Sequence, residues 1–408
     1  MTANDTGLIP RPAGHDESGS LARRLVWVFV ITNTVGYGAL IQTVPVLLLP
    51  MARDLDASRT AVAGATTLAI LVSAVAAIPV GSLLDRYGGR ALMSAGSAIG
   101  VVGVIACARA EDLPTLYGAF VLIGLALAMS TYEAAFAVLV VATEASGRDR
   151  AFVVVTMLTG LGTSLYYPLT GWLESQLGWR TTLLVLASSL ALIALPAHLW
   201  ALPGRAAHAR RIVARTGLRV GHAVRSVRFW LLLLGFVAQA GATSAFLVAM
   251  VTYFRDIGFS AGVASSLPLA VGLLQITSRL ALAPLAARFG MARVTAASFA
   301  IQGAGLLALP LAGTSVPSTL ACVACFGLGY GVSVVARPSI VADVFGVAHF
   351  ASILAVMTAP MALSRAGAPL GAVWLGDWRF LVAAGAMTLL SAAALIPVAR
   401  RGHSTYDT

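Results

Sequence analysis

The sequence contains no lysine, and all 27 of its basic residues are arginine. A P-loop that binds nucleotide phosphates needs a lysine at a fixed place, so an ATP-driven pump of that type is excluded within this chain. Schiff-base chemistry needs a lysine amine and is excluded with it. The absence of one residue type therefore removes P-loop ATP hydrolysis and lysine-based covalent catalysis from the candidate functions.

Charged residues of either sign are scarce. They make up 11% of the 408 residues, and hydrophobic residues make up 59%, whereas about 25% of the residues of an average soluble protein are charged. Apolar runs of about 20 residues recur along the whole chain, and a helix of that length crosses a hydrocarbon core about 30 Å thick. The composition predicts an all-α polytopic membrane protein.

The sequence also lacks the side-chain clusters that are typical of enzymes and metal sites. Its three cysteines, Cys107, Cys322 and Cys325, lie within apolar runs without ligand spacing around them, so we expect neither a disulfide nor a metal ion. No nucleophile elbow, metal cluster or phosphate loop is present. We therefore expect no enzymatic activity, no catalytic residue and no cofactor.

The apolar runs divide into twelve predicted membrane spans. The first six are Leu25–Leu49, Ala61–Leu84, Ala91–Ala108, Leu113–Val141, Ala151–Leu173 and Thr181–Leu202. The second six are Phe229–Phe254, Ala264–Ala287, Met291–Ala312, Ser318–Val341, Phe350–Leu375 and Trp378–Ala399. Between the two sets lies a basic linker that carries Arg205, Arg210, Arg211, Arg215, Arg219, Arg225 and Arg228.

The arginines are distributed unevenly between the two sides of the predicted protein. The side opposite the termini and the linker carries only Arg53, Arg59, Arg109, Arg180, Arg255 and Arg379. Short arginine-rich loops stay in the cytoplasm, so this bias places both termini and the linker there. We expect cytoplasmic tails at residues 1–24 and 400–408, six-helix bundles at 25–202 and 229–399, and a cytoplasmic linker at 203–228, in the inner or plasma membrane.

A short charged turn between the second and third predicted spans returns, in altered form, about half a chain length later. Leu83, Arg86, Tyr87 and Gly88 in the first copy are matched by Leu285, Arg288, Phe289 and Gly290 in the second. At the same spacing, Arg53 and Asp54 are echoed by Arg255 and Asp256. The chain is therefore predicted to be a parallel repeat of two related bundles, which places a substrate path between the halves, near the middle of the membrane.

With these features the sequence resembles the major facilitator superfamily over nearly its whole length. The signature of that family between the second and third helices corresponds here to Gly81, Asp85, Arg86, Gly88 and Arg90. The resemblance implies secondary transport by alternating access, with the two bundles rocking about a central site. It also implies that these five residues form a gating motif, in which Asp85 holds the halves closed on the cytoplasmic side through contacts with arginine.

Three ionisable side chains stand well inside predicted spans, where each costs at least about 2.5–3.5 kcal/mol to insert. They are Glu133 in the fourth span, Arg279 in the eighth and Arg365 in the eleventh, whereas Arg337 lies nearer the cytoplasmic end of the tenth. Gln275 lies one turn before Arg279 on the same helix face. Two guanidinium groups without an acidic partner in the membrane interior of their half indicate an anion as the third party.

Some members of the superfamily that exchange small carboxylates have a basic residue on each of the eighth and eleventh helices, and Arg279 and Arg365 match that arrangement. We therefore expect these two arginines and Gln275 to bind the substrate. The alternative is that one or both arginines pair with Glu133, or bond to backbone carbonyls, and act only as structural contacts.

Glu133 falls in the cytoplasmic half of its span. A carboxyl at that depth is a candidate for taking up a proton during the transport cycle, although a neighbouring arginine opposes this. The alternative is a permanent ion pair with an arginine across the bundle. Further candidates for the cavity wall are Tyr37, Gln239 and Tyr330, for which ordinary hydrogen bonding between helices is the alternative.

The leading hypothesis is a secondary active transporter that moves a small organic molecule, with an organic anion such as a carboxylate preferred, by proton coupling or exchange. The alternatives are proton-antiport efflux of a hydrophobic drug or metabolite, and a membrane sensor that does not transport. Drug–proton antiporters of the superfamily have an arginine where this chain has Phe120. We expect a monomer whose partners are the substrate, a proton or counter-substrate and the lipid bilayer, and we expect no nucleic acid.

Overall fold

The computed structural model describes residues 14–205, 217–376 and 378–400, and within these ranges the chain is almost entirely helical. The helices of the first half are α1 (Gly14–Tyr37), the π-helical turn η1 (Gly38–Gln42), α2 (Val44–Asp54), α3 (Arg59–Tyr87), α4 (Gly89–Ala108), α5 (Leu113–Ser130), α6 (Tyr132–Ala142), α7 (Ala145–Ser164), α8 (Tyr166–Ser189), the π-helical turn η2 (Leu190–Ala194) and α9 (Leu195–Ala201). Those of the second half are α11 (Val220–Arg225), α12 (Val227–Asp256), α13 (Ala261–Phe289), α14 (Met291–Ala312), α15 (Val316–Phe345), α16 (Phe350–Leu375) and α17 (Arg379–Arg400).

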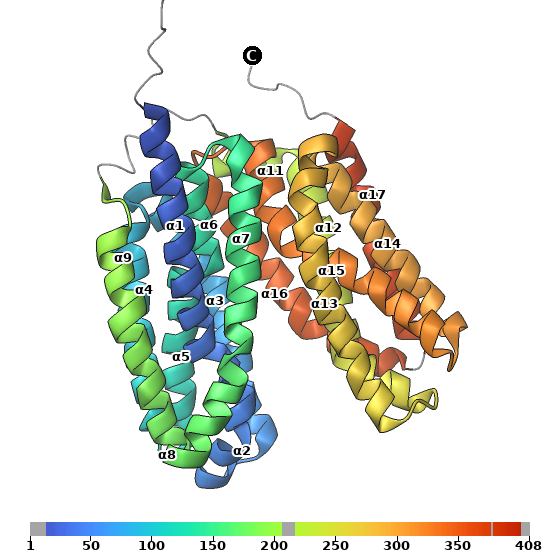
Figure 1. Ribbon diagram of the computed structural model, residues 1–408, viewed down its shortest axis with the longest axis horizontal. Helices are drawn as coiled ribbons and strands as arrows, with labels where there is room; N and C mark the ends of the chain where they lie inside the picture. Colours follow the sequence, from blue (N-terminus) through green and yellow to red (C-terminus); the bar gives the residue numbers. More distant parts are fainter. Residues whose placement is uncertain (1–13, 206–216, 377, 401–408) are drawn as a thin grey trace, which may run out of the picture.

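The helices form two bundles that stand side by side (Figure 1). Helices α1–α9, blue to green, make up one bundle, and α12–α17, yellow to red, make up the other. The bundles meet where α3 packs on α16 and where α7 packs on α13 and α15. They lie close together on the side where α1 begins and α17 ends, which we call the terminal side, and spread apart toward the opposite, far side (Figure 1).

The prediction of twelve membrane-crossing helices is confirmed. Eleven described segments are long and apolar enough to cross a membrane, and one of them, Gly147–Ala201, has 55 residues. A straight helix of that length would extend about 80 Å, far beyond a bilayer. Gly178 breaks it with a φ of 73°, a backbone conformation that glycine adopts at little cost, so this segment crosses twice.

The spans differ from the predicted ones mainly at their ends and within the first span. Helix α1 begins at Gly14, well before Leu25, and the first span continues through α2 to Asp54. The span is interrupted at η1 because Pro45, at the start of α2, has no backbone N–H for the helical ladder. The backbone hydrogen bonds of the preceding turn therefore span five residues instead of four, which makes that turn π-helical.

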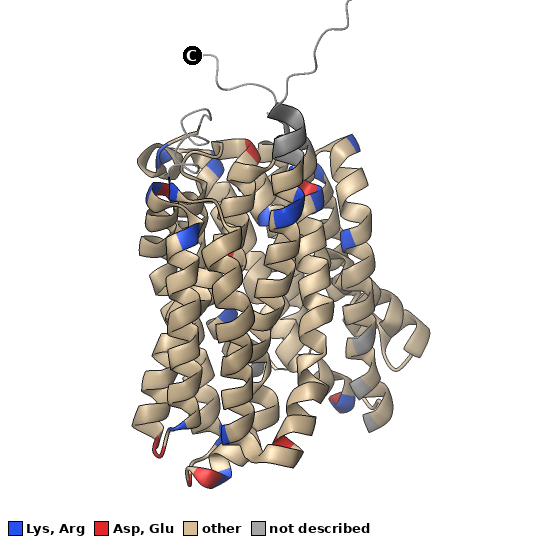
Figure 2. Ribbon diagram, turned by 60° about the vertical axis from the view of Figure 1, so that its left-hand side comes forward, with Lys and Arg blue, Asp and Glu red and all other residues tan. Residues whose placement is uncertain are grey.

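The repeat predicted from the charged turn has a backbone counterpart. Gly88 ends α3 and Gly290 ends α13, with φ angles of 80° and 85°. In each half the next helix begins at once, α4 at Gly89 and α14 at Met291. Charged residues gather toward the two ends of the molecule, and only a few lie between them (Figure 2). Both features agree with a membrane protein built from two related halves.

Helices within each half approach one another through glycine. Gly124 of α5 faces α3 so closely that a Cβ atom there would lie 2.5 Å from the Ala69 carbonyl oxygen. Gly118, on the same helix, has no neighbour within 4 Å of the equivalent position. Of these two glycines of α5, only Gly124 is required for the close contact between α3 and α5.

We predict that Gly124→Ala destabilises the protein and that Gly118→Ala does not. Alanine improves helix propensity at both positions by about 1 kcal/mol, but at Gly124 its methyl group must push α5 from the α3 backbone, and overpacking of this kind costs about 1–3 kcal/mol. The melting temperatures of the two purified variants in detergent measure the difference. Equal melting temperatures would contradict this account of the α3–α5 contact.

Candidate functional site

A cavity of about 530 Å³ lies between the two bundles. Its wall comes from α1, η1, α3, α5 and α6 of the first half and from α12, α15 and α16 of the second. Its polar lining residues are Tyr37, Thr67, Ser73, Thr131, Glu133, Ser244, Arg337, Thr358 and Arg365. Val248 and Pro369 also line a second hollow of about 610 Å³ toward the far ends of α12 and α16. The central cavity therefore continues toward the far side.

A break in the fourth span positions Glu133. The hydroxyl of Ser130 donates to the Ala126 carbonyl at 2.7 Å, and that of Thr131 donates to the Leu127 carbonyl at 2.6 Å. Such bonds compete with the backbone ladder, and Thr131 leaves the helix with φ −109° and ψ −154°. Helix α6 then begins inside the protein with Glu133 in its first turn, where the positive end of the helix dipole stabilises a carboxylate.

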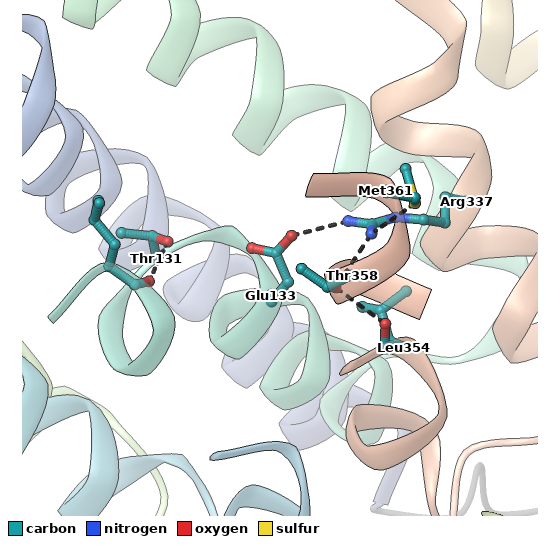
Figure 3. Close-up of polar contacts among 7 residues, drawn as sticks. Thr131, Glu133, Arg337, Leu354, Thr358 and Met361 are labelled. Atoms are coloured by element: carbon teal, nitrogen blue, oxygen red, sulfur yellow. Dashed lines mark hydrogen bonds and ion pairs between the residues drawn. The ribbon is translucent and has the colours of Figure 1, made fainter. Parts of the chain in front are cut away.

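Glu133 forms an ion pair with Arg337 across the two halves (Figure 3). The Nη2 atom of Arg337 lies 2.9 Å from Oε1 of Glu133. The other terminal nitrogen, Nη1, lies 3.4 Å from Thr358 Oγ1 and 3.4 Å from Met361 Sδ. The Arg337 side chain is 11% exposed and that of Glu133 is 32% exposed. The sequence placed Arg337 nearer the end of its span, whereas its guanidinium group reaches the central cavity.

Arg365 lines the same cavity and is exposed to it. Ser244 of α12 fixes the backbone here, because its hydroxyl donates to the Arg365 carbonyl at 2.7 Å. Among the residues that the structure describes, none forms a hydrogen bond or ion pair with the Arg365 guanidinium group. A cation that is exposed in the interior of a membrane protein and has no protein partner can bind an anion through its N–H donors.

Arg279 is placed differently from Arg365, although the sequence grouped the two together. Its side chain is 7% exposed. Its Nε donates to the Gly331 carbonyl at 3.1 Å and its Nη1 to the Thr156 carbonyl of α7 at 3.3 Å. These bonds tie α13 to α15 and to α7 of the other half. They match the alternative in which Arg279 bonds to backbone carbonyls as a structural contact. Gln275 is half-buried one turn away, and neither residue is part of the cavity wall.

Of the remaining predicted wall residues, only Tyr37 reaches the central cavity. Its ring packs 4.8 Å from that of Tyr132. Gln239 is buried and donates to Gln302 of α14 at 2.7 Å and to Thr243 of its own helix at 3.2 Å, so its bonds stay within the second half. Tyr330 stacks on Phe326 with ring centroids 6.1 Å apart.

The charged turn joins the halves on the terminal side through Asp85. Its carboxylate accepts from the backbone N–H groups of Ala351 and Ser352 at 3.1 and 2.9 Å and from the Ser352 hydroxyl at 2.5 Å. These groups belong to the first turn of α16, whose dipole attracts a negative charge. Gly81 permits the approach, because a Cβ atom there would lie 2.6 Å from the Ala351 carbonyl oxygen.

The arginines of the turn have other partners, so the expected contact between Asp85 and arginine is corrected. The Arg86 guanidinium lies 5.4 Å from the Tyr87 ring centroid, and that of Arg205 lies 4.7 Å from the same ring. Arg90 donates to the Leu199 carbonyl of α9. Asp85 is instead satisfied by unpaired N–H groups of a helix end, which short-range sequence patterns do not mark as charge partners.

Two further contacts, which the sequence analysis missed, hold the terminal side together. Arg148 of α7 lies 3.3 Å from Asp343 of α15, and the Ser339 hydroxyl donates to the Asp149 carboxylate. All four residues lie near the terminal ends of α7 and α15. The structure is therefore closed on the terminal side, and its cavity continues toward the far side.

Comparison with known proteins identifies the family. A sequence model of the Major Facilitator Superfamily matches residues 26–359. The chain belongs to this superfamily. Its members are transporters rather than enzymes, so this chain is a multi-pass membrane transporter and not an enzyme. Transporters of this superfamily bind small-molecule substrates and co-transported ions and are typically monomeric.

Solved structures share the superfamily fold at low sequence identity. The E. coli fucose:proton symporter FucP, in its outward conformation, is 16% identical with a TM-score of 0.69, covering 95% of this chain and 98% of its own. The proton:xylose symporter XylE is 14% identical with a TM-score of 0.66, covering 92% and 95%. The human organic anion transporter MFSD10 is 16% identical with a TM-score of 0.71, covering 92% and 99%.

One curated relative is similar in sequence over part of the chain. It is monocarboxylate transporter 11 of Homo sapiens, which is 31% identical over 193 residues. The match covers 45% of this chain and 38% of that protein. The chain therefore aligns with well under half of this relative's length.

We predict that Asp85→Asn loosens the terminal side while leaving expression nearly intact. The neutral amide loses the charge that α16 attracts, and a hydrogen bond to a charged group contributes about 1.5–3 kcal/mol, or roughly ten- to a hundred-fold in the opening equilibrium. Hydrogen exchange at the first turn of α16, which holds the two N–H donors, should accelerate, and turnover should fall.

Asp112→Asn is the matched control for this variant. Asp112 also caps a helix start, because its carboxylate accepts from the Thr115 N–H at 2.8 Å, but that helix is its own. Hydrogen exchange in α16 should therefore stay at the wild-type rate in Asp112→Asn. Wild-type exchange and turnover in Asp85→Asn would rule out Asp85 as a gating contact.

Proposed function

We propose that this transporter moves an organic anion by alternating access and that the anion binds to Arg365 in the central cavity. The observation that carries the proposal is the guanidinium group of Arg365, which is exposed to the cavity and has no protein partner among the described residues. An unpaired charge in a membrane interior is expensive, and such charges usually mark a substrate path.

The charges of the cavity favour an anion over a cation. Glu133 and Arg337 neutralise each other at 2.9 Å, so the third charged wall residue, Arg365, leaves a surplus of one positive charge. A monoanion would complete the balance, whereas an organic cation would meet like charge. Arg365 also offers a carboxylate two parallel N–H donors, which a point charge such as lysine cannot do.

The size and the lining of the cavity suggest an anion with an apolar body. Much of the wall is apolar, including Ile41, Ile70, Leu71, Leu127 and Val248. A volume of about 530 Å³ lies within the range of about 300–1,000 Å³ that drug-sized ligands occupy. Two similar proteins, a monocarboxylate transporter and an organic anion transporter, support this substrate class.

We further propose that transport is coupled to protons or proceeds by exchange, with Glu133 as the proton carrier. Its carboxyl lines the cavity and is 32% exposed, so a proton can reach it through the cavity water. Protonation would raise the surplus charge of the cavity from one to two, so that a proton and an anion favour each other's binding. FucP and XylE, which share the fold, are described as proton symporters.

The contacts between the halves support the proposed alternating-access cycle. The contacts of Asp85 with α16 and of Arg148 with Asp343 close the terminal side, and they must break for the cavity to open there. We propose that the terminal side faces the cytoplasm, because the arginine-rich loops lie on it, and that the protein works as a monomer in the inner or plasma membrane.

Efflux of a hydrophobic drug or metabolite is a second candidate, and the apolar cavity wall favours it. A neutral or cationic ligand of that kind would bind the wall without using Arg365. A sensor that binds without moving its ligand is the third candidate. Flux into proteoliposomes separates the sensor from both transporters, since a sensor produces no flux.

We predict that Arg365→Gln nearly abolishes the binding of carboxylates, whereas Arg365→Lys weakens it less. Removing one partner of a desolvated charged contact costs about 2–5 kcal/mol, or roughly thirty-fold to several thousand-fold in affinity. Lysine retains the charge but not the two-pronged geometry. The dissociation constants of benzoate and 4-phenylbutyrate, measured by titration of purified wild type and variants, test this order.

Arg279→Gln is the comparison that separates the two arginines. Because Arg279 bonds to the carbonyls of Gly331 and Thr156, its loss should lower the melting temperature but leave carboxylate affinity within about three-fold in the folded protein. Unchanged carboxylate affinity in Arg365→Gln would contradict the anion site and favour the efflux candidate.

A further inference from the structure

We propose that Arg337 is a second ligand for the substrate anion and that protonation of Glu133 releases it for this role. This inference rests on the proposed function, because it assumes that an anion binds at Arg365. The ion pair between Glu133 and Arg337 is then the contact through which a proton changes the affinity for the anion.

The position of Arg337 allows it to reach an anion held by Arg365. Both residues line the central cavity. The Nη1 atom of Arg337 lies 3.4 Å from the sulfur of Met361, and Met361 precedes Arg365 by one helical turn on the same face of α16. The two guanidinium groups therefore approach the same stretch of α16, one from α15 and one from α16 itself.

The contacts of Arg337 would allow a substrate carboxylate to replace the carboxylate of Glu133. Glu133 is its only charged partner among the described residues, at 2.9 Å. Its contacts with Thr358 and Met361 are long, at 3.4 Å, and a thioether is a weak acceptor. The carboxylate of Glu133 thus occupies the place of a substrate anion, and the cavity that would hold the substrate reaches both members of the pair.

The proton carrier of this proposal is Glu133, because it is the carboxyl that lines the cavity. Arg337 faces it from α15, and Tyr37 of α1 and Arg365 of α16 line the same cavity. The cavity residues contributed by α3 and α5 carry no charge. In α4 and α7, which also pack near α6, the charged residues lie in the first turns, at Arg90, Arg148, Asp149 and Arg150. Within these segments, Glu133 is the carboxyl that reaches the cavity.

The exchange leaves both guanidinium groups in contact with a carboxylate. When a proton binds to Glu133, its carboxyl becomes neutral and the bond from Arg337 loses its charge-assisted strength. The carboxylate of the substrate then takes that bond while it also binds Arg365. Because Glu133 belongs to the first half and Arg337 to the second, the link between the halves passes from a protein carboxylate to the substrate. Binding and movement of the halves are thereby connected.

The decisive comparison is between Glu133→Gln and the double variant Glu133→Gln with Arg337→Gln. Both lack the carboxylate, so neither leaves an unpaired negative charge, and replacing both members of an ion pair is commonly tolerated. The melting temperature of each unliganded variant checks folding. A third variant, Glu133→Gln with Arg337→Lys, keeps the positive charge and provides the same comparison if the double glutamine variant does not fold.

We expect Glu133→Gln to bind benzoate and 4-phenylbutyrate at pH 8 at least about ten-fold more tightly than wild type, with little dependence on pH between 5 and 8. Wild type should bind them more tightly as the pH falls. Adding Arg337→Gln to Glu133→Gln should weaken binding at least about ten-fold, and Arg337→Lys should weaken it less.

Two other outcomes have distinct meanings. If carboxylates bind through Arg365 but the double variant binds them as tightly as Glu133→Gln does, Arg337 is only a structural partner of Glu133 and this inference is wrong, while the proposed function stands. If neither wild type nor Glu133→Gln binds any carboxylate, the proposed function is wrong and the inference falls with it.

Discussion

The cost of placing charge in hydrocarbon governs this structure. Each ionisable side chain in the membrane interior needs a partner, water or a ligand. Glu133 and Arg337 satisfy each other at 2.9 Å, and Arg279 is satisfied by two backbone carbonyls. Arg365 faces the cavity instead. The four deep charges thus separate into a cross-half pair, a structural bridge and a group without a protein partner among the described residues, to which we propose that the substrate binds.

The same constraint explains how the halves are held and how they can part. The polar contacts that close the terminal side are those of Asp85 with the first turn of α16 and of Arg148 with Asp343, and a buried apolar cluster also runs across the two halves. Polar contacts near the membrane surface can be exchanged for contacts with water at low cost. The close approach at Gly81 keeps this closed arrangement compact, while apolar packing is retained within each half. Alternating access therefore needs no unfolding of either bundle.

Much of the fold could be predicted from the sequence because bilayer thickness fixes the length of each span, and the turn at Gly88 returns at Gly290 with the same backbone geometry. The roles of the arginines could not be predicted from the sequence. Whether Arg279 meets a carbonyl or a ligand depends on how α13 packs on α15 and α7, and the depth of Arg337 depends on how far α15 extends beyond the membrane. Tertiary packing decides both, and the spacing of residues along one helix does not report it.

The central claim is that the negative charge of the ligand, and not its apolar body, determines binding in the cavity. The most direct test is a stability titration of the purified wild-type protein with paired ligands, phenylacetate against phenylacetamide and 4-phenylbutyrate against its amide. A ligand that binds only the folded state raises the melting temperature as its concentration increases. The account predicts such a rise with each carboxylate and little change with the matching amide. Equal rises with both members of each pair would contradict it.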